Sequence, residues 1–327
     1  MTLKSSYVKF FFGLFIYLIS IGSFSAQEQE TDTTGIPFVA YWSKGDEYNF
    51  QITKVKQEWK DDALTKNDSS SYKVNFKVID STETSYKIHW TYEFSFGGFN
   101  IPNVLLNTLN ETIPTEVIYT TNELGEFEGV ENWKEIARKM EAYTNGLITS
   151  LKDKADFDEK EFRTTFKPFL EIFTSKDGIE QIVLKELQYF HFPFGVEFSP
   201  TEVITYEDEI PNFIGGEPIK GNTKIFVESV DHEYSYCVLK QEMKIDPEDM
   251  RRMLVELFKQ MGLGKDKENS FLDTANIDVT DQNTYEYYYF PGVPSLIETL
   301  RTAVVDLGKG TTTRVEKLRI ELLWDEE

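Results

Sequence analysis

The chain has 327 residues, with 34 Lys and Arg against 56 Asp and Glu, a formal charge of −22 at pH 7, and one cysteine, Cys237. The excess of acidic residues argues against nucleic acid as a partner, because a phosphate backbone is bound by basic surfaces. A single cysteine excludes an intramolecular disulfide, so the fold must be stabilised by burial of apolar surface, for which this length suffices.

The N-terminal segment, residues 1–26, predicts a secretory signal peptide. Lys4 and Lys9 precede an apolar run over 10–19, which is too short for a typical membrane helix. We expect cleavage after Ser25 or, with a bulkier residue upstream, after Ala26. Removal of this segment leaves 32 basic residues against 56 acidic ones, a formal charge of −24. The mature chain is therefore expected in the periplasm or outside the cell, with no membrane span.

The next part of the chain predicts strands after a flexible leader over 27–40, which is acidic and rich in Thr. Apolar residues alternate with polar ones around 48–52 and again over 71–96. A period of two is typical of strands with one buried face, and we expect 71–96 to form two such strands that share a core. The polar residues 60–70 predict a loop before them.

The centre of the chain predicts helices. Trp133, Ile136 and Met140 recur at helical spacing. A second amphipathic pattern carries Phe162, Phe166, Phe169 and Phe173, and a third runs over 177–190. Pro168 lies inside the second pattern and is expected to kink or restart that helix. We interpret the aromatic stripes as core, because neighbouring amphipathic helices need one another's apolar faces.

The second half returns to strands. Residues 200–204 repeat 114–118 letter for letter, which either a duplication of β units or coincidence would explain. Asp246 and Pro247 predict the start of a helix. We expect strands or strand pairs over 223–229, 234–243 and 284–290, and a closing hairpin over 296–306 and 311–324 whose first arm could instead be helical.

These elements predict an α+β fold. It would contain a large curved antiparallel sheet or open barrel, a central helical insertion, and a packed helix from the C-terminal half that covers the apolar face. We expect one large domain over 41–327. The alternative is two β-rich halves, 41–130 and 200–327, joined by the helical segment 131–190.

Few residues suit catalysis. The histidines are expected on a polar strand face (His89), in an extended segment pointing away from phenylalanines (His191) and in a solvated turn (His232). The sequence shows no metal-ligand spacing, hydrolase elbow or phosphate-binding loop, and Cys237 is expected to be a small buried hydrophobe. We therefore expect no enzyme, no metal and no cofactor. The alternative is a hydrolase, because two carboxylates that are distant in the sequence could face each other in the folded protein.

Two aromatic segments supply the candidate ligand-binding residues, which are Phe192, Phe194, Tyr285, Tyr287 and Tyr288. Buried strands would explain both segments. The functional hypothesis is that they line a cleft for an unknown apolar or amphipathic small molecule. The alternative is an envelope-associated scaffold or interaction protein, which would have an envelope protein as its partner and no small-molecule ligand. An apolar cavity would favour the first hypothesis, and a solid core with an exposed apolar patch the second.

In its composition and N-terminal segment, the chain resembles uncharacterised secreted proteins of the Bacteroidota. The resemblance depends on the Lys- and Phe-rich signal, the Ala26-Gln27-Glu28 junction and the strands rich in Tyr, Phe, Lys and Glu. It implies export. The expected curved sheet around helices is also similar to periplasmic lipoprotein carriers, which is a likeness of fold alone.

Overall fold

The computed structural model describes residues 35–93, 115–151, 158–180, 184–210, 212, 216–260, 276–306 and 310–324. The expected signal peptide with its cleavage site, and most of the leader, lie outside these ranges.

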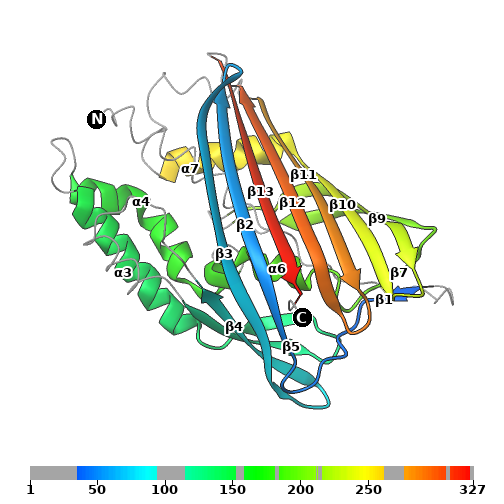
Figure 1. Ribbon diagram of the computed structural model, residues 1–327. Coiled ribbons are helices and arrows are strands. Elements are labelled where there is room, and N and C mark those ends of the chain that lie inside the picture. The colour runs from blue at the N-terminus through cyan, green and yellow to red at the C-terminus, as the bar shows by residue number, and fades with distance from the viewer. Residues whose placement is uncertain are drawn as a thin grey trace.

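One antiparallel sheet of 11 strands dominates the described residues (Figure 1). Its strand order is β6-β5-β4-β3-β2-β13-β12-β11-β10-β9-β8, so chain neighbours are mostly sheet neighbours. The early and late strands meet where β2 pairs with β13, which places both β-rich halves in the same sheet. Its strands are β2 (Glu47–Lys60), β3 (Ala63–Ser81), β4 (Ser85–Glu93), β5 (Glu116–Asn122), β6 (Phe127–Val130), β8 (Val203–Ile210), β9 (Ile219–Asp231), β10 (Tyr236–Ile245), β11 (Asn276–Tyr288), β12 (Val293–Asp306) and β13 (Thr311–Leu323).

The remaining elements are short or helical. β1 (Ile36–Pro37) and β7 (Glu197–Phe198) form a separate pair. Helices α3 and α4 contact each other beside the sheet, and α7 contacts β9 and β11 (Figure 1). The helices are α3 (Trp133–Leu151), α4 (Glu159–Thr174), α5 (Lys176–Gly178), α6 (Lys185–His191) and α7 (Pro247–Gln260).

The predicted α+β class is wrong, because the protein is mostly β. Strand residues outnumber helical residues by more than two to one. The strand content was underestimated partly because residues 60–70 were predicted as a loop. In the structure these residues extend β2 and β3 into a long hairpin. Asp61 and Asp62 form its two-residue turn with φ of 47° and 67°, as the type I′ turn of a tight hairpin requires. Polar strands exposed on both faces lack the alternation by which a strand is recognised.

The helical prediction needs two smaller corrections. α4 runs without interruption through Pro168, in contrast to the expected kink or restart. The pattern over 177–190 forms the short helices α5 and α6 instead of one helix. The closing hairpin is confirmed, because β12 pairs with β13 along its length.

The core lies on one face of the sheet, and Phe190 of α6 occupies its centre. The ring centroid of Phe190 is 5.4 Å from that of Phe50, 5.4 Å from Phe76 and 5.5 Å from Trp90. All four side chains are fully buried. Edge-to-face and stacked rings at these separations stabilise the fold beyond their buried area. The sheet therefore wraps around α6 and the residues that follow it.

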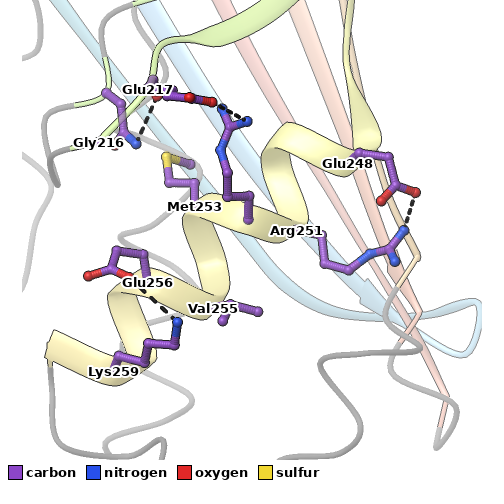
Figure 2. A pocket seen from close by; sticks show the side chains of 10 residues that line it. Gly216, Glu217, Glu248, Arg251, Met253, Val255, Glu256 and Lys259 are labelled. Atoms are coloured by element: carbon purple, nitrogen blue, oxygen red, sulfur yellow. Dashed lines mark hydrogen bonds and ion pairs between the residues drawn. The ribbon is translucent and has the colours of Figure 1, made fainter.

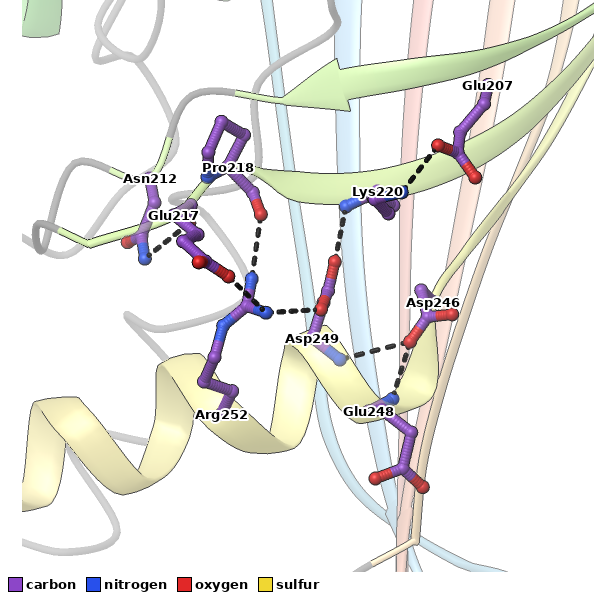
Figure 3. Close-up of polar contacts among 9 residues, drawn as sticks. All are labelled: Glu207, Asn212, Glu217, Pro218, Lys220, Asp246, Glu248, Asp249 and Arg252. Carbon is purple, nitrogen blue, oxygen red and sulfur yellow. Dashed lines mark hydrogen bonds and ion pairs between the residues drawn. The ribbon is translucent and has the colours of Figure 1, made fainter.

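Helix α7 covers a second region of the same face, and polar contacts fix its first turns (Figure 3). The Asp246 carboxylate accepts hydrogen bonds from the backbone N–H of Glu248 and Asp249 at 2.8 and 3.0 Å, which confirms the predicted helix start. Asp249 in turn accepts from the backbone N–H of Lys220 at 2.9 Å, and Arg252 donates to the carbonyl of Pro218 at 2.8 Å. These bonds attach α7 to the start of β9. Its buried apolar residues are Met250, Met253, Leu254 and Leu257.

We predict that Phe190→Ala lowers the free energy of unfolding by about 3–5 kcal/mol, because it leaves a cavity among three aromatic rings. Phe290→Ala is the matched control, since the Phe290 side chain is 62% exposed. Its cost should stay below about 1 kcal/mol. Urea denaturation of both variants measures the two changes. Equal losses would contradict the central place of Phe190 in the core.

Candidate functional site

A row of alternating charges crosses the core-facing side of the sheet. Lys56 of β2 lies opposite Glu316 of β13, Glu316 lies opposite Arg301 of β12, and Arg301 lies opposite Asp281 of β11. We call these four residues the charge row. It separates the aromatic core around Phe190 from the apolar residues beneath α7, which do not belong to that core cluster.

The inner end of the row is a buried ion pair. Arg301 and Asp281 are 3% and 2% exposed. The Arg301 Nε donates to Asp281 Oδ1 at 2.6 Å, and a second bond joins Nη2 to Oδ2, so the pair is bidentate. Burial acts to lower the pKa of Arg301, but the charge and hydrogen bonds of Asp281 outweigh it and raise that pKa. Replacing both members of such a pair by apolar residues often costs little, whereas removing one member leaves a buried charge without its partner.

The outer end of the row carries groups whose pKa values are displaced. Burial lowers the pKa of Lys56 to about 8. Burial also acts to raise the pKa of Glu316, but nearby cations, Arg314 first, outweigh it and the net shift is downward. Arg314 Nη2 lies 2.6 Å from Glu316 Oε1. Charges of both signs therefore compensate one another along the row.

Helix α6 carries a polar edge that faces this row. Burial lowers the pKa of Lys185 to about 7, and the cation of Arg301 adds to that effect. Glu186 lies 3.3 Å from Lys54 Nζ and accepts a hydrogen bond from the Tyr92 hydroxyl at 2.9 Å. A cavity of about 50 Å³ remains between α6 and the strands, with Lys56, Lys185 and Arg301 among its lining residues. That volume has room for only a few water molecules. The charge row and the polar edge of α6 therefore pack against each other and leave no space for a larger ligand between them.

His191 ends α6 in the aromatic core. Its Nδ1 lies 2.8 Å from the carbonyl oxygen of Gly125 and its Nε2 lies 2.9 Å from the Tyr119 hydroxyl. A carbonyl only accepts, so Nδ1 carries the proton and Nε2 accepts from Tyr119. Burial lowers the pKa of His191 to about 4, which keeps the ring neutral. The predicted extended geometry is wrong, because residues 185–191 are helical and turn His191 inward.

The structure brings four of the five predicted ligand-binding residues together, in the core. Phe192 stacks on Tyr285 with ring centroids 4.9 Å apart, and Phe194 contacts Tyr287 edge to face at 5.9 Å. Phe194, Tyr285 and Tyr287 are buried, and the Tyr285 hydroxyl donates to Gln241 at 3.1 Å. The cavity of about 50 Å³ beside α6 is lined by other side chains. The rings of these four residues therefore pack against other side chains of the core and do not line that cavity.

The fifth residue, Tyr288, points to the opposite face and belongs to an exposed aromatic group. Tyr288 lies opposite Tyr236 of β10, with ring centroids 5.4 Å apart, and contacts Trp324 at 5.8 Å. Trp324 and Tyr234 are 67% and 66% exposed. We call Tyr234, Tyr236, Tyr288 and Trp324 the aromatic end. They lie where β11 and β13 end and β10 begins.

Carboxylates border the aromatic end. The Tyr236 hydroxyl donates to Glu286 Oε2, and burial together with this bond raises the pKa of Tyr236 to about 12. Asp231 Oδ1 accepts from the backbone N–H of Glu233 and Tyr234 at 3.0 and 3.2 Å, which fixes the β9–β10 turn. A depression of about 380 Å³ lies between these groups. It is lined by Asp231, Tyr234, Tyr236, Glu286, Tyr288 and Ser295.

A larger depression, of about 510 Å³, lies along the exposed side of α7 (Figure 2). Its cations already have acidic partners. Arg252 lies 3.3 Å from Glu217 and 2.7 Å from Asp249, Lys259 lies 3.8 Å from Glu256, and Arg251 pairs with Glu248. Exposed pairs of this kind contribute about 0–1 kcal/mol each. The positive charges of this depression are therefore neutralised by acidic residues of the same surface.

Sequence reasoning missed both the charge row and the aromatic end. A signal existed for the first, because Lys56, Asp281, Arg301 and Glu316 occupy positions that continue the core-facing alternation of their strands. Charged residues in a buried register usually need partners of opposite sign. The aromatic end had a weaker signal, since its members come from three separate parts of the chain and only the sheet register joins them.

The described residues limit other chemistries. None of the described helices is long and apolar enough to cross a bilayer. Within the described ranges, no three His, Cys, Asp or Glu side chains gather in a metal-binding group. Cys237 is fully buried and burial raises its pKa to about 12, so its thiol stays protonated, and the prediction of a small buried hydrophobe is confirmed.

No protein-family model matches the chain, and no curated protein matches it. Among solved structures, the crystal structure of Ail, the attachment invasion locus protein of Yersinia pestis, aligns with 86% of this chain and 100% of its own. The identity is 5% and the TM-score 0.15. A score this low carries no argument about fold or function.

We predict that Lys185→Met stabilises the protein below pH 7, by about 1–3 kcal/mol, because the folded state no longer buries a cation. Since the Lys185 pKa falls from 10.5 unfolded to about 7 folded, the unfolded chain binds an extra proton between these values. Wild-type stability therefore rises with pH over that window, and the advantage of the variant shrinks. Urea denaturation at several pH values measures this. Lys259→Met, at an exposed site, is the control, and a pH-independent difference would contradict the prediction.

We predict that Arg301→Met costs about 3–5 kcal/mol of unfolding free energy, because it leaves the Asp281 carboxylate buried without its cation. The double variant Arg301→Met with Asp281→Leu should regain most of that loss, since two apolar side chains of similar volume replace the pair. Urea denaturation of the single and double variants gives the coupling free energy. A double variant no more stable than Arg301→Met would show that the pair is not the main partner of each residue.

Proposed function

We propose that this is an exported, non-enzymatic protein of the cell envelope that acts through its surface, as a scaffold or interaction protein, and holds no small-molecule ligand. The observation that carries the proposal is the filled inner face of the sheet. Phe190, Phe192 and Phe194 occupy the position that an apolar ligand would need, and their rings contact Trp90, Tyr285 and Tyr287.

The contrast between interior and surface supports the proposal. Tyr285 and Tyr287 are 0% exposed, whereas Tyr234 and Trp324 are about two-thirds exposed, at 66% and 67%. Exposed Tyr and Trp side chains are enriched at protein interfaces, where a large rigid ring contributes contact area at low entropic cost. A solid core with exposed aromatic groups is the combination expected of a protein that binds at its surface.

The charge distribution agrees with a surface role. Several ion pairs lie on the outer face of the sheet, such as Arg319 with Glu298 and Lys224 with Glu242 at 3.7 Å. These keep the outer face hydrated. The N-terminal segment with its expected cleavage after Ser25 or Ala26 supports export, and with it a place in the envelope.

The test is native mass spectrometry of the chain purified gently from its own host, followed by organic extraction. We expect the mass of the bare polypeptide and an empty extract. A stoichiometric lipid or other apolar molecule would contradict the proposal and restore the ligand-binding hypothesis. As a control for retention, the Phe190→Ala variant hollows the core and should take up benzene added to the sample, as engineered apolar cavities do.

A further inference from the structure

The aromatic end has the chemistry of a cation-binding surface. Its rings lie on the outer face, with Tyr236 and Tyr288 in register and Trp324 against Tyr288. A guanidinium or ammonium group is attracted to the face of an aromatic ring, and the interaction is stronger for the planar guanidinium, which also stacks. Tyr234, Tyr236 and Tyr288 line one depression, and Trp324 lies beside it against Tyr288, so several ring faces are close together.

The polar groups of this depression have one sign of charge. Asp231 and Glu286 are its charged lining residues, and none of the six lining residues is basic. The Tyr236 hydroxyl, held neutral by its raised pKa of about 12, donates to Glu286 and so orients that carboxylate beside the rings. A partly buried carboxylate next to ring faces complements a cation that both stacks and donates paired hydrogen bonds.

The depressions beside α7 and between α3 and α4 lack this one-sided charge among their described lining residues. The α7 depression pairs Arg252 and Lys259 with acidic residues, and the groove between α3 and α4 is lined by Arg163 and Lys167 as well as Glu141 and Glu171. The whole chain carries −22, which attracts cationic partners from a distance and repels acidic ones.

We propose that the aromatic end binds an arginine-bearing basic segment of a partner protein. The inference rests on the proposed surface function and names the chemistry of its partner. One guanidinium stacks on Tyr288 or Trp324 and forms hydrogen bonds to Glu286, while Asp231 accepts a second basic side chain. The depression of about 380 Å³ has room for more than one such side chain.

The experiment is isothermal titration calorimetry of the full chain with the peptide acetyl-Gly-Arg-Gly-Arg-Gly-amide at low salt. The matched probe replaces both arginines with citrulline, which keeps the shape and removes the charge. We expect the arginine peptide to bind about tenfold more tightly, because the neutral ureido group of citrulline loses the charge-assisted bonds and the cation–π attraction to the rings.

Two variants locate the binding site. Glu286→Gln keeps an acceptor for the Tyr236 hydroxyl and should weaken the arginine peptide about tenfold. Glu242→Gln makes the same change in net charge elsewhere on the outer face, where Glu242 pairs with Lys224, and should change affinity less than about twofold. Tyr288→Ala, with its fold checked by urea denaturation, should also weaken binding.

Three outcomes would overturn the inference. Equal affinity for the citrulline peptide would remove the role of charge, and equal losses in Glu286→Gln and Glu242→Gln would show diffuse attraction in place of a site. Binding of cellotetraose that Tyr288→Ala abolishes, without arginine-peptide binding, would assign the surface to a neutral glycan. Native mass spectrometry tests the proposed surface function independently of these results. A chain without a bound small molecule supports that function, whereas a co-purified ligand contradicts it.

Discussion

The packing of Phe190 against the curved sheet is the interaction on which the rest of the structure depends. Its ring contacts side chains of β2, β3 and β4, which belong to one half of the sheet, and its neighbours Phe192 and Phe194 contact β11 in the other half. One short segment thus links both β-rich halves through their common inner face (Figure 1). A filled inner face leaves the outer surface as the place where function is carried.

The charge row explains how α6 keeps its orientation on an otherwise apolar face. Glu186 contacts Lys54, and Lys185 lies by Arg301 and Glu316, so one edge of the helix is polar and the other, with Phe190, is aromatic. A helix of seven residues has little stability of its own, and contacts on both edges specify its rotation. The lowered pKa of Lys185 is a consequence of this placement, because a basic group is held away from water.

The aromatic end and the charge row lie on opposite faces of the same sheet, and their charges are arranged in opposite ways. In the charge row, buried charges of both signs satisfy one another, which suits a structural role. At the aromatic end, ring faces and the carboxylates of Asp231 and Glu286 stand at the surface without a basic residue among the lining residues. Complementarity then has to come from another molecule. This difference is why we assign binding to the second surface.

Local periodicity by itself determined much of the secondary structure. The alternation at Ile88 and Trp90, the cap at Asp246 and the helical spacing from Trp133 correctly predicted β4, α7 and α3. It failed where strands are polar on both faces, as near Asp62, because nothing local then distinguishes a strand from a loop.

The sequence also identified two aromatic segments, and the ligand-binding hypothesis placed Phe192, Phe194, Tyr285, Tyr287 and Tyr288 along one cleft. Only the tertiary structure decided that the first four fill the core, that Tyr288 faces outward toward Tyr236 and Trp324, and that Lys56, Glu316, Arg301 and Asp281 form a row. The physical reason is register. Side chains on neighbouring strands meet according to pairings between residues far apart in the chain, and a shift by one residue would move each of them to the opposite face.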